Sequence, residues 1–272
     1  MALRSTRAEV AKVVVLTVTA AAVLVPFWVM LSISFKDQRQ FLRNIFYPAP
    51  PFHWENYAAG WEAVAPYVGN TILVAFLVTA ISLTCSSLTA YVFSRYDFPG
   101  RRALFAALIV LLMIPGVLNL IPQYVLALKL GVVNTIWGLV LFYVAGRQVL
   151  EVYILRSFFQ GIPRELFEAA QMDGAGHVRQ YWSIALPLSK SIIGVLVIMT
   201  VIFVWNDFIW PLVVADDFKT VSYGLSFLTK QHSTAWGALM AGYTLASLPL
   251  LVLFAFAMRY FVEGVSSGAI KA

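Results

Sequence analysis

Long apolar segments alternate with short polar ones along the whole chain. A helix needs about 20 mostly apolar residues to cross the hydrocarbon core of a membrane. A transmembrane β-barrel would instead show short segments of alternating polarity. The pattern therefore predicts an all-α integral membrane protein with six transmembrane helices, at residues 13–35, about 68–93, 103–126, 133–158, 191–210 and 237–260.

The segments between these helices suggest the topology. The first apolar run is longer than the ~7–15 residues of a signal-peptide core and lacks a clear small-residue cleavage site, so we interpret it as a retained span. Lys and Arg are roughly twice as frequent in the loops on the N-terminal side, which favours both termini in the cytoplasm. The other segments are a cytoplasmic N-terminus (1–12), an external loop (36–67), a core (68–263) that includes a cytoplasmic loop (161–187), and a cytoplasmic tail (264–272).

Composition and charge exclude several classes of protein. Hydrophobic residues make up 61% and charged residues 12% of 272 positions, whereas a soluble domain carries about 25% charged residues. A soluble fold of this length could not bury so much apolar surface, so the lipid bilayer must surround it. The net charge of +6 is spread over short loops rather than gathered on one face, and we expect no nucleic-acid partner. One cysteine and three widely separated histidines predict no metal site.

Two charged residues interrupt the fourth predicted helix. Arg147 and Glu151 are spaced i, i+4, so they can pair along one helix face. An arginine at a helix centre costs roughly 2.5–3.5 kcal/mol on insertion scales and therefore needs a partner or water. One interpretation places the pair on the solute pathway or at a gate, and we favour it slightly. The alternative is a neutralised pair buried against a partner subunit.

Further polar side chains lie near helix ends or prolines. Asn119 and Gln123 are one turn apart, close to two prolines whose freed backbone groups would be tolerated beside a watery cavity. Asn206 and Asp207 end the fifth predicted helix and could either bind hydroxyl groups or cap the helix. For the first pair, a packing kink at the prolines is the alternative to a solute-lining role, and we favour the kink slightly. The candidate solute-pathway residues are Asn119, Gln123, Arg147, Glu151, Asn206 and Asp207.

The longest predicted cytoplasmic loop holds a short capped helix. Pro163 suits the first helical position, and Glu165 and Glu168 suit the helix dipole near the first turn. Gly174 is placed to end the helix in the left-handed conformation. We expect Leu166, Phe167 and Ala170 to form an apolar patch on it. The helix could be a docking knob for a partner or an amphipathic segment resting on the inner leaflet, and the physics favours neither.

At this point the sequence resembles a known family. The pattern E-A-A-x3-G-x9-I-x-L-P is typical of the permease subunits of ATP-binding-cassette (ABC) importers, and this chain matches all seven specified positions. The residues that the resemblance assigns to ATPase coupling are Glu165, Leu166, Phe167, Glu168, Ala169, Ala170, Met172, Asp173, Gly174, Ile184, Leu186 and Pro187. Further resemblance, to the smaller, maltose-type permease of carbohydrate importers, lies at Asn70-Thr71, 98–102, 113–116, 130–135, 205–208 and 259–264.

The resemblance implies a type I ABC importer permease bundle in a bacterial or archaeal cytoplasmic membrane. It implies that the short helix is a coupling helix seated on a cytoplasmic ATPase. The implied partners are a second homologous permease, two ATPase subunits and an extracytoplasmic solute-binding protein. ATP and Mg²⁺ would be bound by the ATPases, with no cofactor and no catalysis in this chain, and the solute would be a sugar or a related polar molecule.

A gradient-driven secondary transporter and an intramembrane enzyme are the two alternative functions. A proton- or sodium-driven transporter would carry several intramembrane carboxylates, and only Glu151 lies clearly within a predicted helix. An intramembrane enzyme would need a nucleophile–base pair or a metal cluster, and no histidine or paired aspartate lies in the predicted helices. The sequence also lacks the P-loop pattern G-x-x-x-x-G-K-[ST], so an ATP-driven process would need another chain to bind ATP.

Overall fold

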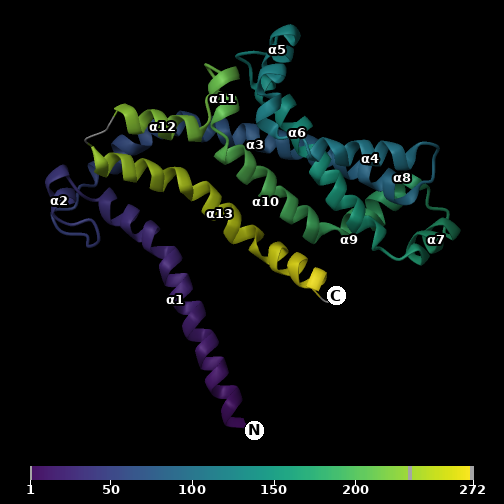
Figure 1. The fold of residues 1–272 in the computed structure, drawn as a ribbon, viewed down its shortest axis with the longest axis horizontal. Helices are drawn as coiled ribbons and strands as arrows, with labels where there is room; N and C mark the ends of the chain where they lie inside the picture. The colour runs from purple at the N-terminus through teal and green to yellow at the C-terminus, as the bar shows by residue number, and fades with distance from the viewer. Residues whose placement is uncertain (1, 232–234, 270–272) are drawn as a thin grey trace. The chain divides into compact units, whose positions relative to one another are not determined.

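The computed structural model describes the backbone of residues 2–231 and 235–269, and every long element within them is a helix (Figure 1). The chain divides into two compact units, Met1–Pro66 with Gly224–Leu248 and Tyr67–Tyr223 with Pro249–Ala272. Three helices, α3 (Glu55–Arg95), α12 (Val221–Gln231) and α13 (Trp236–Ala269), run from one unit into the other. Each of the remaining elements lies entirely within one of the two units.

Four helices among the described residues are long and apolar enough to cross a membrane: α1 (Ala2–Ser34), α3, α6 (Ile136–Gln160) and α13. Two further pairs pass the same test as bent units. The first joins α4 (Arg101–Leu112) to η1 (Gly116–Asn119) and α5 (Leu120–Leu130), with a bend of 95°. The second joins α8 (His177–Gln180), η2 (Tyr181–Ala185) and α9 (Leu186–Leu188) to α10 (Lys190–Asn206), with a bend of 75°. Six spans result only if each bent pair counts as one.

Both bends lie close to a proline. Pro115 is the N-cap of η1, and because proline disfavours helical geometry in the residue before it, residues 113–115 separate the two helices. The single continuous helix predicted at 103–126 is therefore wrong, whereas a kink near the prolines of this segment fits the structure. The second bend lies at Ser189, after Pro187 and before the helix predicted at 191–210, so it falls outside that prediction.

Several predicted boundaries also move. α3 begins at Glu55, so the second half of the segment expected as external loop 36–67 is helical. α10 ends at Asn206 rather than at residue 210, because Asp207 is extended and a separate short helix, α11 (Ile209–Val214), follows. α13 continues to Ala269, so most of the predicted tail 264–272 is helical, and its last three residues lie outside the described part of the chain.

The first unit is organised around the C-terminal end of α1. Lys36 is the first residue of the predicted external loop, yet it is only 1% exposed, and its Nζ donates a hydrogen bond to the Asn44 carbonyl at 2.6 Å. Asn56 donates to the carbonyls of Ser34 and Lys36 at 2.9 and 3.0 Å. Gly237 approaches so closely that an added Cβ would lie 2.2 Å from the Lys36 oxygen. These contacts join α1, α3 and α13 within this unit.

The second unit is built around α6. Both α4 and α10 pack against it, and α11 contacts both α5 and α6. The small residues of α3 at positions 75, 82, 86 and 90 are buried, which fits helix–helix packing. Two apolar clusters form the core of this unit. One contains Val74, Leu139 and Val204, and the other contains Leu155, Phe167 and Leu196.

Candidate functional site

The E-A-A segment forms α7 (Arg164–Met172), a nine-residue helix. Pro163 lies one position earlier than predicted, as the N-cap rather than the first helical residue. Gly174 has φ +79°, which confirms the predicted left-handed termination. The amide of Gly174 donates to the Gln171 carbonyl at 3.0 Å and that of Ala175 to the Ala170 carbonyl at 2.8 Å. These two bonds close the helix and turn the chain back towards α8.

The two large apolar residues of α7 point in different directions. Phe167 is buried, whereas Leu166 is 46% exposed. Met172, in the last turn, is 89% exposed. The predicted single patch of Leu166, Phe167 and Ala170 is therefore wrong, because adjacent positions on a helix are about 100° apart. Phe167 anchors α7 to the rest of the unit, and the outer face carries Leu166, Met172 and the two glutamates.

Arg95, at the end of α3, holds this anchor in place. Its guanidinium carbon lies 3.9 Å from the centre of the Phe167 ring. Its Nη2 donates hydrogen bonds to the carbonyls of Phe159 and Ile162, at the C-terminal end of α6. A cation is favourable at this position because the last carbonyls of a helix are otherwise unpaired. One side chain therefore joins α3, α6 and α7, and nothing in the sequence pattern pointed to it.

The second half of the E-A-A pattern packs into the same place. Ile184 and Leu186 are partly buried against the cluster that contains Phe167 and Tyr181. Pro187 is exposed and sits at the break before α10. The spacing between the two halves of the pattern thus lets the chain leave the unit as α7 and return to it as η2 and α9.

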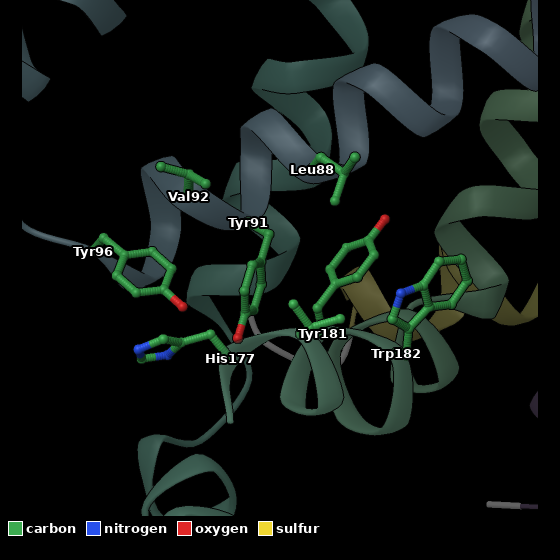
Figure 2. A pocket seen from close by; sticks show the side chains of 8 residues that line it. Leu88, Tyr91, Val92, Tyr96, His177, Tyr181 and Trp182 are labelled. Carbon is green, nitrogen blue, oxygen red and sulfur yellow. The ribbon is translucent and has the colours of Figure 1, made fainter. Parts of the chain in front are cut away.

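A groove of about 400 Å³ lies between α3 and the return segment (Figure 2). Figure 2 shows Leu88 and Tyr91 of α3, and Tyr96 directly after it, opposite His177, Tyr181 and Trp182. The Tyr181 hydroxyl is 2.7 Å from Ser87 Oγ, and the Tyr96 and His177 rings are 5.1 Å apart. These contacts tie the segment after α7 to the end of α3.

Arg147 and Glu151 lie deeper in the second unit. Their predicted pairing along one helix face is confirmed by a separation of 3.7 Å between Arg147 Nε and Glu151 Oε1. Glu151 is fully buried and accepts hydrogen bonds from Ser82 at 3.1 Å, Ser86 at 2.9 Å and Thr200 at 2.8 Å. Thr200 in turn accepts one from Arg147 Nε at 3.3 Å. The carboxylate thus joins α3, α6 and α10 of this one chain, and its place on a solute pathway stays a prediction.

The other candidate pathway residues are only partly brought together. Gln123 and Asp207 line one pocket, whereas Asn119 and Asn206 are not among its lining residues. The Asn206 side chain instead donates to the Ile202 carbonyl of its own helix at 3.0 Å. Asp207 accepts a hydrogen bond from the Tyr143 hydroxyl at 2.7 Å and one from the Ile209 amide at 3.2 Å. Asp207 is the C-cap residue of α10 through its backbone amide, and its carboxylate still faces a pocket.

Comparison with known proteins identifies the family. Residues 82–267 match the family described as binding-protein-dependent transport system inner membrane component. The probable ABC transporter permease protein YurM of Bacillus subtilis (strain 168) is 32% identical over 247 residues, covering 90% of this chain and 82% of YurM. The melibiose/raffinose/stachyose import permease protein MelC of the same strain is 29% identical over 279 residues, covering 99% of this chain and 100% of MelC.

A solved structure shows the same fold. It is the crystal structure of a bacterial ABC transporter involved in the import of the acidic polysaccharide alginate, and one of its chains matches with a TM-score of 0.78 and 20% identity. The match covers 95% of this chain and 98% of that one, which confirms the expected permease fold. The chain therefore belongs to the binding-protein-dependent inner membrane components, as the multi-pass, non-catalytic permease of a multisubunit ABC importer whose ATPase partners bind ATP.

Proposed function

We propose that this chain pairs with a second, homologous permease to form the translocation pathway for an oligosaccharide or a related neutral, hydroxylated solute. Two cytoplasmic ATPases and an extracytoplasmic solute-binding protein complete the importer. Overall likeness to MelC, which is named for the import of melibiose, raffinose and stachyose, supports the solute class. The excess of Lys and Arg on one side supports a topology with both termini in the cytoplasm.

In this proposal α7 is the coupling helix. The observation that carries it is the two-sided nature of α7: Phe167 is locked to Arg95 and the end of α6, while Leu166 and Met172 are exposed beside Glu165 and Glu168. An exposed apolar patch with charged neighbours is typical of a protein-docking surface. Because the inner face is held by α3 and α6, a displacement of α7 by an ATPase would be passed to two membrane helices.

Cross-linking from α7 tests this assignment. Cys85 is the only cysteine, so a Cys85→Ser chain carrying Ala169→Cys can be labelled at one position with a maleimide benzophenone. In the assembled importer, illumination should join this chain to an ATPase subunit. Leu118→Cys, 69% exposed on η1 in the same unit, is the matched control. η1 leads directly into α5, which Figure 1 shows away from α7. Equal ATPase labelling from both positions, or none from Ala169→Cys, would contradict the proposal.

A further inference from the structure

A pocket of about 440 Å³ opens in the second unit where two interrupted helices meet. One wall comes from η1 and α5, which follow the 95° bend, and another from the junction between α10 and α11. Irregular backbone within a membrane protein is tolerated where it is buried in protein or lines a watery cavity, and interrupted helices commonly border transport sites. The lining residues are Gly116, Val117, Leu120, Gln123, Phe142, Tyr143, Gly146, Phe203, Asp207, Ile209 and Trp210.

Aromatic rings form the firm part of this pocket. Phe142 and Trp210 lie 4.9 Å apart between ring centres, and Tyr143 and Phe203 lie 5.6 Å apart edge to face. Trp210 is fixed by a hydrogen bond from its Nε1 to the Gly138 carbonyl at 3.0 Å. Phe203 is 40% exposed, so part of its ring is free to receive a ligand. The C–H face of a sugar ring packs against such a surface.

Two polar groups converge on the same space. The Asp207 carboxylate is oriented by its bonds from Tyr143 and from the Ile209 amide, yet a carboxylate has about four acceptor positions, so further bonds can be accepted. The amide of Gln123 makes no hydrogen bond to any other residue whose side chain is described. It offers two donors and an acceptor. A small number of fixed polar groups on an apolar, aromatic lining is the usual composition of a small-molecule site.

The charge of the lining selects among solutes. It contains one carboxylate, Asp207, and no Lys or Arg. A phosphate or carboxylate group on the solute would meet this charge. The cation beside the pocket, Arg147, lies 5.4 Å from the centre of the Phe203 ring and is already paired with Glu151 at 3.7 Å. A hydroxyl group, in contrast, can donate to the carboxylate, and such charge-assisted bonds are stronger than neutral ones.

We propose that this pocket is a solute-binding subsite on the translocation pathway that takes one ring of a neutral, polyhydroxylated solute. The ring packs on Phe203, and its hydroxyls bind Asp207 and Gln123. The inference rests on the proposed function, since a solute must pass this chain for the pocket to matter. It adds a location, a set of contacts and a discrimination against acidic solutes.

Gly146 provides a test that fills the pocket with little disturbance of the fold. A Cβ added at Gly146 meets no atom within 4 Å, and the same is true of Gly69, on α3 outside the pocket. Both glycines are exposed and helical, so Gly146→Leu and Gly69→Leu form a matched pair. The assay is uptake of labelled melibiose, raffinose and maltose into vesicles that contain the whole importer, with ATPase activity and subunit assembly measured in parallel.

For the sugar that the wild type imports, Gly146→Leu should reduce uptake about tenfold or more, while assembly is retained and Gly69→Leu stays close to wild type. Phe203→Leu should raise the KM for uptake about tenfold, since the loss of a stacking contact of roughly 1.4 kcal/mol corresponds to that factor. Phe203→Tyr should restore it. A purely structural role of Phe203 would not separate the KM from the maximal rate in this way.

The outcomes separate the two claims. If the wild-type importer takes up none of the three sugars, the proposed solute class fails and this inference falls with it. The other outcome is that the importer takes up a sugar, and that Gly146→Leu and Phe203→Leu both behave like Gly69→Leu. In that case the pocket is not a solute-binding subsite, and the proposed function is unaffected.

Discussion

Removal of the Glu151 carboxylate would leave a buried arginine without its counter-ion. In the intact chain Arg147 is 8% exposed, and its Nη2 has no hydrogen-bond partner among the described residues. Its charge is balanced directly by Glu151 at 3.7 Å and indirectly through Thr200, which accepts from the arginine and donates to the carboxylate. In Glu151→Ala the ion pair and the Thr200–carboxylate bond disappear together. Arg147 keeps only the neutral Thr200 hydroxyl and the Phe203 ring beside it, so no negative charge balances it.

The size of the effect follows from comparing two contributions. Interhelical hydrogen bonds in a membrane protein are worth about 0.6 kcal/mol on average, so the loss of the bonds from Ser82, Ser86 and Thr200 amounts to roughly 2 kcal/mol. Breaking a buried ion pair by removing one partner costs about 3–5 kcal/mol, because the remaining charge stays desolvated. The unpaired arginine therefore dominates. A double variant, Arg147→Met with Glu151→Leu, removes both charges and should cost clearly less than Glu151→Ala.

The assay is the free energy of unfolding, from titration with sodium dodecyl sulfate followed by tryptophan fluorescence. Glu151→Ala should be destabilised by about 3–5 kcal/mol, and Ser86→Ala, which keeps the ion pair, by about 0.5–1.5 kcal/mol. Equal losses for these two variants would refute the claim that the buried charge pair, rather than the hydroxyl bonds, dominates this network. So would a double variant as unstable as Glu151→Ala.

Three further predictions concern α7, its anchor and the first unit. Gly174→Ala forces alanine into φ +79°, so it should cost about 1–2 kcal/mol of stability and uncouple ATP hydrolysis from uptake. The control Gly176→Ala, at φ −69°, should leave both stability and coupling unchanged. Arg95→Ala removes the cation over Phe167 and two hydrogen bonds to the end of α6. It should lower the uptake per ATP hydrolysed while the two permeases stay associated. Normal coupling would contradict the role of Arg95 in anchoring α7. Gly60→Ala should destabilise the chain in the same unfolding titration, because its Cβ would lie 2.7 Å from a backbone nitrogen of α13, and an unchanged unfolding curve would contradict that contact.

The sequence predicts the long elements well because membrane helices follow from apolar length alone. The four unbroken candidate spans lie where the apolar runs predicted them. The bend at Pro115 was placed inside one span because the apolar run at 103–126 continues through it, and hydropathy does not record backbone direction. Greater weight on this proline would have signalled the break. The bend at Ser189 lies before the apolar run at 191–210, in a segment expected to be a loop.

The coupling segment shows a similar division. The left-handed conformation of Gly174 could be predicted from the local sequence, because it depends only on how the helix ends. The opposite directions of Leu166 and Phe167 depend on which side of α7 meets the unit, and that is decided by Arg95, about 70 residues earlier in the chain. The i, i+4 pairing of Arg147 and Glu151 was readable from one helix, but the hydroxyl groups that complete it come from two others.

The same limit applies to the pocket. Gln123 and Asp207 were singled out as polar residues near helix interruptions. They line one pocket because α11, which follows Asp207 closely in the chain, packs against α5. The aromatic walls were not foreseen, since Phe142, Tyr143 and Phe203 look like any other apolar positions of a membrane helix. Only the three-dimensional arrangement shows which of them border a cavity.

The central claim is that α7 transmits ATP-driven movement to a pathway formed in part by this chain. Uptake of an imported sugar into vesicles that contain the assembled importer, with ATP on the side of α7, tests this most directly. It is measured for the wild type and for Glu168→Arg, which reverses a charge on the exposed face of α7. We expect wild-type uptake to require ATP, and the variant to lose uptake while the two permeases stay associated. Uptake that continues without ATP, driven by a proton or sodium gradient, or that is unchanged in the variant, would contradict it.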